Sequence, residues 1–321
     1  MSVKIAVIDT GVNFELLNGN IEISDYVSLE IKRYNGETYI HISEGKSYEN
    51  TKASTHGTDV INTISKYSGD TKIQIQLYDI FGGTEKSSGI LIIEALNMIM
   101  NRDVEMIVMS LTCDSEYESE FMKFRNSILA KNIIFLSSMS NDGKQNCPSY
   151  LDFVYGVGGQ GYTENGKYSY NPERRYQFWS NTQYEFVGPL DDLQLFDGTS
   201  KATAVIAGIL AKFIDKKGKV ALQEYLKTPY SNLVLEKSEV PNDLQCNRKL
   251  LVRVLSAFGL EISDITDELL VALIPWNTRN RKSLIYLFES LGCLERLLDL
   301  NYCEFKSIYK IVKALEKIIC K

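Results

Sequence analysis

The chain has 321 residues, of which 44% are hydrophobic and 24% are charged, as is usual for a folded globular protein. This length accommodates one full α/β domain and a smaller second domain. The formal net charge is −6, and the sequence contains no long run of charges of one sign. Both features argue against a nucleic-acid partner. No stretch approaches the roughly 20 apolar residues of a membrane span, so we expect no membrane partner.

Strand and helix patterns alternate along the first two thirds of the chain. Short apolar runs predict strands, and apolar residues at helical spacing predict helices. The predicted strands are Lys4–Asp9, Ile73–Tyr78, Met106–Ser110, Ile133–Ser137 and Val154–Val157, and the predicted helices are Asp59–Lys66, Gly89–Met100, Glu118–Ala130 and Lys201–Lys216. Residues 162–184 are rich in Tyr, Asn and Gly and predict a hairpin with loops. This alternation predicts an α/β fold with a mostly parallel sheet and helices on both faces.

The character of the chain changes after about residue 235. Residues 234–247 are polar and turn-rich, whereas residues 248–321 carry Leu and Ile at helical spacing, with a turn at residues 275–279. We therefore predict two domains, residues 1–235 and a small all-helical domain of residues 248–321. The second faintly resembles the later helices of an acyl carrier protein, but Lys282 precedes Ser283 where a carrier has Asp. The alternative is a helical bundle that docks on the first domain or binds a partner protein.

Three short motifs contain the side chains of a nucleophilic triad. They are Asp9-Thr10-Gly11, Thr55-His56-Gly57-Thr58 and Gly198-Thr199-Ser200. A serine hydroxyl attacks well only when an imidazole takes its proton, and the imidazole needs a carboxylate to fix its tautomer. The chain has two histidines, and His41 lies in an alternating stretch without a partner motif. We therefore predict that Asp9, His56 and Ser200 are catalytic.

These motifs together resemble those of the subtilisin-like serine proteases, or subtilases. The matching segments are residues 6–12, 55–60, 133–143 and 197–202. The order Asp, His, Ser is the order of that family. The resemblance covers residues 1–235 and implies a subtilisin-like fold and serine endopeptidase activity. It also implies that Asn141 donates a hydrogen bond to the oxyanion of the tetrahedral intermediate.

The resemblance further implies that a peptide substrate binds as an added strand. One wall of its site is Ser110, Leu111 and Thr112, and the other lies near Gly83–Ser88. The first specificity pocket is lined by Ser137, Ser138, Met139 and the turn that contains Cys147. Asp142 is placed near its floor, where an acid would favour a basic residue before the cut. The alternative is a solvated acid beside Gly143.

The predicted first strand starts at residue 3 or 4 and leaves no room for a signal peptide, which indicates a cytoplasmic location. The six cysteines show no metal-ligand spacing and are expected to be free thiols there. No acidic loop has calcium-ligand spacing, so we expect neither a metal nor another cofactor.

Two classes of function follow. The first is a cytoplasmic serine endopeptidase that cuts a dedicated precursor peptide or protein, for instance by removing a leader. The second is a regulated or partner-binding protein whose helical domain mediates the interaction and whose protease is a switch or idle.

Overall fold

The chain folds into two units in the structure, a computed structural model that describes residues 2–45, 55–82, 87–161, 164–233, 246–261, 263 and 266–319. The first unit consists of Met1–Gln160, Gly166–Thr182 and Val187–Leu233. The second consists of Gly161–Asn165, Gln183–Phe186 and Val234–Lys321. Two short segments that the sequence placed in the first domain, residues 161–165 and 183–186, thus group with the C-terminal helices.

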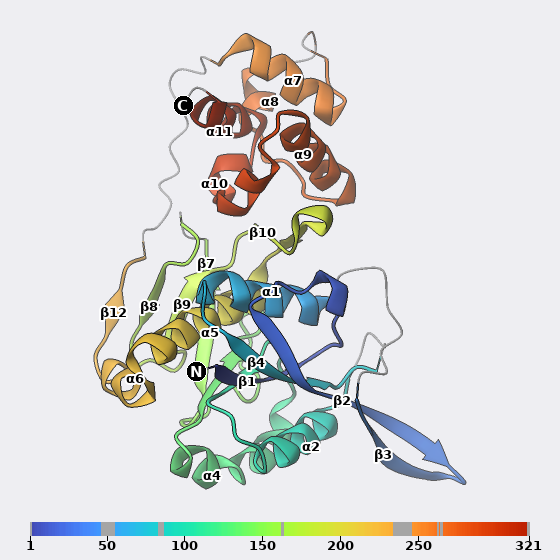
Figure 1. Ribbon diagram of the computed structural model, residues 1–321, viewed down its shortest axis with the longest axis vertical. Coiled ribbons are helices and arrows are strands. Elements are labelled where there is room, and N and C mark those ends of the chain that lie inside the picture. Colours follow the sequence, from blue (N-terminus) through green and yellow to red (C-terminus); the bar gives the residue numbers. More distant parts are fainter. Residues whose placement is uncertain are drawn as a thin grey trace. The chain divides into compact units, whose positions relative to one another are not determined.

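Ten strands within the described ranges of the first unit form one sheet (Figure 1). In spatial order they are β12 (Tyr230–Ser231), β8 (Tyr168–Tyr170), β9 (Phe178–Asn181), β7 (Tyr155–Gln160), β6 (Ile134–Ser138), β5 (Met106–Met109), β1 (Val3–Asp9), β4 (Ile73–Asp79), β2 (Ile21–Tyr34) and β3 (Glu37–Glu44). All neighbours from β9 to β2 are parallel, whereas β12, β8 and β3 run antiparallel to their neighbours. The mostly parallel sheet expected from the sequence is confirmed.

Helices cover both faces of this sheet (Figure 1). The side chains of β1 point alternately to the two faces, and those on both faces are buried. One buried cluster contains Val3, Ile5 and Val7, and the other contains Ala6 and Ile8. Helices α1 (His56–Ser68) and α5 (Gly198–Lys217) contribute to the first cluster, and α2 (Gly89–Ile99), α3 (Glu118–Met122) and α4 (Arg125–Ala130) contribute to the second. A strand that is buried on both faces reads as a continuous apolar run, which is why β1 was recognisable in the sequence.

Some elements differ from the sequence prediction. The helix expected over 118–130 is divided into α3 and α4. The hairpin of β2 and β3, which the sequence analysis did not anticipate, turns at Asn35-Gly36, both at positive φ. The hairpin expected within residues 162–184 is present as the antiparallel pair β8 and β9. The remaining described elements between residues 2 and 233 are α6 (Lys219–Tyr225), β10 (Glu185–Val187), β11 (Gln194–Phe196) and the 3-10 turns η1 (Phe14–Leu16), η2 (Ser115–Tyr117) and η3 (Leu190–Asp192).

The C-terminal part of the second unit is helical, as expected. Its described elements are α7 (Arg248–Phe258), α8 (Asp267–Val271), α9 (Thr278–Ser290), the 3-10 turn η5 (Leu294–Asp299), α10 (Tyr302–Phe305) and α11 (Ile308–Ile319). Phe305 is fully buried there, with its ring 5.4 Å from that of Trp276 and 5.5 Å from that of Phe186. The resemblance to an acyl carrier protein stays a prediction. Every helix in the described parts of the chain is too short or too polar to cross a bilayer.

The contact between α1 and α5 depends on a glycine. A Cβ atom on Gly208 would lie 2.6 Å from the carbonyl oxygen of Ile64 and 2.8 Å from Cβ of Tyr67. The missing side chain therefore lets the two helices approach until their backbones touch. His56 and Ser200 lie in the first turns of these helices, so this contact helps to set their separation.

We expect Gly208→Ala to destabilise the fold by about 1–2 kcal/mol, because the added methyl group must push α1 away from α5. Alanine's higher helix propensity offsets only part of this cost. The measurement is the urea midpoint of the variant against wild type. Gly19→Ala is the matched control, since its Cβ would meet no atom within 4 Å. An equal midpoint for both variants would show that the helix contact tolerates the methyl group.

Candidate active site

Asp9 is the last residue of β1 and is fully buried. It lies at the carboxyl end of a parallel strand, the edge at which α/β sheets place their ligand sites. Its Oδ1 atom accepts a hydrogen bond from the backbone N–H of Thr10 at 2.7 Å and lies 2.7 Å from Nδ1 of His56. The carboxylate is thus held by its own turn and aimed at the imidazole.

His56 is held by the first turn of α1. Thr55 caps this helix, because its side-chain oxygen accepts from the N–H of Thr58 at 3.2 Å. Gly57 lies against the Asp-Thr-Gly turn, where a Cβ atom would overlap the carbonyl oxygen of Thr10. Its N–H donates to Oγ1 of Thr10 at 2.8 Å. The glycine after the histidine therefore permits the close approach that brings imidazole and carboxylate together.

The imidazole is in an environment that favours its protonated form. Its side chain is 36% exposed, and the ring of Phe196 lies edge-on to it with the centroids 5.5 Å apart. Burial opposes protonation, but the charge of Asp9, its hydrogen bond and the charge of Asp59 outweigh burial and raise the pKa of His56 above 6.5. This direction suits a base that must hold a proton during a reaction.

Ser200 lies in the first turn of α5, two residues after Gly198, which has a φ of +78°. Its Oγ atom donates to the carbonyl oxygen of Ser110 at 3.0 Å. Ser110 directly follows β5, so the hydroxyl faces the same edge of the sheet as Asp9. Within the described residues, this hydroxyl is bonded to Ser110 and not to the imidazole of His56. Donation to His56 requires the hydroxyl to give up this bond to Ser110, and catalytic hydrogen bonds often form only in the substrate complex.

Asn141 follows β6 by three residues and is oriented by Thr199. Its Oδ1 atom accepts from the N–H of Thr199 at 3.0 Å and lies 2.9 Å from the Thr199 hydroxyl. That hydroxyl also lies 2.7 Å from the carbonyl oxygen of Met139. A backbone N–H can only donate, so the oxygen of the amide faces Thr199 and its NH2 group remains for an anionic oxygen. The sequence analysis did not anticipate this role of Thr199, although the residue stands inside the Gly-Thr-Ser motif.

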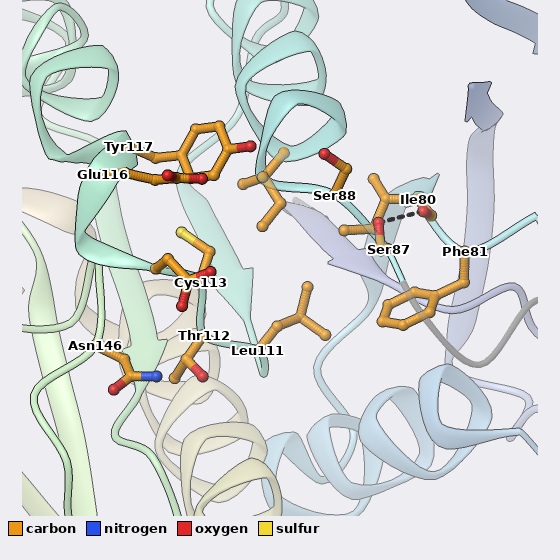
Figure 2. A pocket seen from close by; sticks show the side chains of 13 residues that line it. Ile80, Phe81, Ser87, Ser88, Leu111, Thr112, Cys113, Glu116, Tyr117 and Asn146 are labelled. Carbon is orange, nitrogen blue, oxygen red and sulfur yellow. Dashed lines mark hydrogen bonds between the residues drawn. The ribbon is translucent and has the colours of Figure 1, made fainter. Parts of the chain in front are cut away.

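A cavity of about 350 Å³ lies beside the predicted peptide-binding segment (Figure 2). Leu111 and Thr112 line it, as do Ser87 and Ser88 from the expected opposite wall; the Gly83–Lys86 part of that wall lies outside the described residues. The other lining residues are Ile80, Phe81, Gly89, Ile92, Cys113, Asp114, Glu116, Tyr117 and Asn146. The lining thus combines apolar side chains with the carboxylates of Asp114 and Glu116, neither of which the motifs had indicated.

Two predicted contacts of the first specificity pocket do not have the expected positions. Asp142 is exposed, and its carboxylate pairs with Nζ of Lys144 at 2.7 Å and accepts from the Ser140 hydroxyl at 2.6 Å. Lys144 first, and then Ser140, hold the pKa of Asp142 well below its usual range. This position of Asp142 fits the alternative of a solvated acid and does not fit an acid at the floor of a pocket. Cys147 is fully buried against Cys113, so its side chain does not face a substrate.

The other residues expected in that pocket belong to the sheet. Ser137 and Ser138 lie in β6 and expose almost no surface, because strands β5 and β7 flank them and helices cover both faces. Met139 contributes its carbonyl oxygen to the Thr199 hydroxyl. Across the described parts of the chain, no three His, Cys, Asp or Glu side chains gather in a way that could hold a metal ion.

The parallel sheet and the motifs at its carboxyl edge are those of a serine endopeptidase. The chain belongs to the subtilase family, whose sequence profile matches residues 1–232. No curated protein matches the chain by sequence.

Two solved structures are similar in fold. One is the epidermin leader peptide processing serine protease EpiP from Staphylococcus aureus, with 16% identity, a TM-score of 0.52, and coverage of 70% of this chain and 69% of that chain. The other is described as a lanthipeptide protease, with 19% identity, a TM-score of 0.50, and coverage of 71% of this chain and 76% of that chain. At these identities the likeness shows the fold.

The pKa of His56 predicts the acid limb of the activity profile. An imidazolium cannot accept a proton, so kcat/KM should fall as the pH drops through this pKa, which lies above 6.5. In Asp9→Asn the charge and the charge-assisted bond that raise the pKa are lost while burial remains. The limb should therefore move to lower pH, and kcat should fall by about 10⁴-fold because the imidazole loses its fixed tautomer. The control is His41→Gln in β3, which should keep the wild-type profile; a limb that stays in place in Asp9→Asn would exclude His56 as the titrating group.

The orientation of the Asn141 amide predicts that its removal lowers kcat and leaves KM almost unchanged. Asn141→Ala removes the NH2 donor and should lower kcat by about 10²- to 10³-fold with little change in KM. Thr199→Val keeps the backbone N–H but loses the hydroxyl, so its kcat should fall less, by roughly tenfold. Steady-state kinetics on one peptide substrate separates these effects. A change in KM alone would assign Asn141 to substrate binding.

Proposed function

We propose that this subtilase cuts peptide bonds with Asp9, His56 and Ser200 as its catalytic triad and Asn141 as its oxyanion donor. The observation that carries the proposal is the 2.7 Å hydrogen bond between Asp9 and Nδ1 of His56. With Nδ1 occupied as a donor, the free ring nitrogen Nε2 is the one able to accept the Ser200 proton. The start of α5 adds the positive end of a helix dipole at the nucleophile.

The reaction follows from these positions. Ser200 Oγ attacks the scissile carbonyl carbon while His56 takes the hydroxyl proton, and the Asp9 carboxylate stabilises the imidazolium. The NH2 group of Asn141 stabilises the oxyanion that forms. His56 then gives the proton to the leaving amine, which releases the C-terminal product and leaves an ester on Ser200. Water, activated by the same imidazole, hydrolyses this ester.

We propose that the peptide lies along Ser110, Leu111 and Thr112, with one side chain in the cavity of Figure 2. Leu111, Ile80 and Ile92 would contact the apolar part of that side chain. The position of Leu111 and Thr112, which follow β5 and line the cavity, supports this binding mode, because an added strand binds mainly through backbone hydrogen bonds.

We propose that the substrate is a dedicated precursor peptide or protein and that the reaction removes its leader. Support comes from the fold likeness to a protease that processes the epidermin leader peptide and to a lanthipeptide protease. We also propose that the enzyme acts in the cytoplasm, consistent with the free thiols of all cysteines in the described part of the chain. The C-terminal helical region, which exposes Leu273 in the loop after α8 and Tyr286 on α9, is proposed to bind the precursor or a partner protein.

Two measurements test this function. A fluorophosphonate should label the wild-type protein at Ser200, and Ser200→Ala should lose both the label and about four orders of magnitude or more of peptidase activity. A precursor peptide with an N-terminal leader should be cut at one bond, with a higher kcat/KM than unfolded casein. Wild-type activity in purified Ser200→Ala would exclude the triad. Equal use of both substrates would exclude a dedicated precursor while leaving the triad intact.

A further inference from the structure

Cys113 and Cys147 face each other across a short antiparallel bridge. The N–H of Cys113 donates to the carbonyl oxygen of Cys147 at 2.9 Å, and the N–H of Cys147 donates to the carbonyl oxygen of Cys113 at 3.1 Å. Residues that exchange both bonds in this way have Cα atoms about 5.5 Å apart. This separation is also the commonest one in disulfides, so the backbone is already positioned for a cross-link. Both residues are free thiols in the structure.

The side chain of Cys113 contacts the backbone of Cys147. Sγ of Cys113 lies 3.6 Å from the carbonyl oxygen of Cys147. A hydrogen bond from the Cys113 thiol lowers the pKa of Cys147, and the same bond raises the pKa of Cys113. A thiolate is the species that attacks a disulfide, so Cys113 has to lose its proton before it reacts.

The two thiols differ in their access to solvent. Cys113 is half-buried and lines the cavity, where Figure 2 shows it on the same side as Glu116 and Tyr117. Cys147 is fully buried behind it. A small reagent that enters the cavity therefore reaches Cys113 first, and Cys147 can react only with the sulfur of Cys113.

We propose that Cys113 and Cys147 are a redox site that closes to a reversible disulfide by exchange with a small-molecule disulfide such as oxidised glutathione. This proposal goes beyond peptide cleavage, because neither cysteine contacts the atoms of the triad. Formation of the bond joins the segment after β5 to the turn at Asn146, both of which line the cavity. The cross-link thus acts on the region that is proposed to bind the peptide.

The exchange balances in two steps. Cys113 first loses its proton, which its raised pKa disfavours, and its sulfur attacks one sulfur of oxidised glutathione. The S–S bond of glutathione breaks, and the other half leaves as a thiolate that takes up this proton. The thiolate of Cys147 then attacks Sγ of Cys113, breaks the mixed disulfide and expels the second glutathione. The two cysteines lose two hydrogens and two electrons in total, and oxidised glutathione is reduced to two thiols.

The test is a peptide map of the full chain. The native protein is equilibrated with oxidised glutathione, its remaining thiols are alkylated, and it is digested with trypsin without reduction. Cleavage after Lys123 and Lys144 places the two cysteines in the separate peptides 103–123 and 145–167. We expect these peptides to appear joined, two hydrogens lighter than their sum, and to separate after treatment with dithiothreitol.

Two variants and a second readout complete the experiment. Cys113→Ser should abolish the joined peptide, whereas Cys293→Ser, which removes a buried thiol of the second unit, should retain it. Because the bond closes a loop between residues 34 apart, oxidation should also raise the midpoint of thermal unfolding of the wild type by several degrees and leave that of Cys113→Ser unchanged.

Cys113 found only as a glutathione adduct, or Cys147 alkylated in the oxidised protein, would overturn the proposal. Wild-type mapping decides this even if a variant fails to fold. Since the map does not depend on peptidase activity, failure of the redox site and failure of the proposed triad are separate results.

Discussion

The fit of the Asp-Thr-Gly turn against the start of α1 is the constraint on which the site depends. Gly57 has no side chain to separate the two segments, and its N–H is bonded to Thr10. As a result, a buried carboxylate at the end of one strand meets an imidazole at the start of the next helix at 2.7 Å. The charge of Asp9 costs free energy to bury, and its hydrogen bonds to Thr10 and His56, both on Oδ1, offset part of that cost.

The parallel sheet collects the remaining groups at the same edge. Strands β1, β5 and β6 are neighbours, so the residues that follow them emerge side by side. Asp9 ends the first, Ser110 follows the second and Asn141 follows the third. The close packing of α1 on α5 at Gly208 then brings the helix-borne Ser200 to this edge, where it bonds to Ser110. A rigid scaffold thus orients groups that come from distant parts of the chain.

The proposed substrate contacts come from loops rather than from this scaffold. The cavity beside Leu111 is built from segments after β4 and β5 and from the start of α2. Its wall contains Cys113, whose backbone pairs with Cys147. The proposed triad and the proposed substrate contacts therefore occupy adjacent parts of one sheet edge, and a change in the loop contacts can act on the cavity while the bond between Asp9 and His56 persists.

The sequence by itself identified the chemical groups that lie within short local motifs. The apolar run before Asp9 indicates a buried strand, the glycine after His56 reflects close backbone approach, and the glycine before Ser200 reflects a positive φ. These patterns were sufficient to predict the parallel sheet, the family and the candidate triad, because each pattern consists of residues that are close together in the sequence.

Only the tertiary structure decided contacts between loops that are distant in sequence. The pairing of Cys113 with Cys147 depends on which loops the sheet brings together, and neither local sequence contains a signal for it. Asp142 was expected in a pocket, yet its carboxylate pairs with Lys144 at the surface. The sequence did not predict this pair, because exposed Asp and Lys side chains can each pair with several different neighbours. The orientation of the Asn141 amide likewise became evident only when Thr199, 58 residues away, was seen to donate to its oxygen.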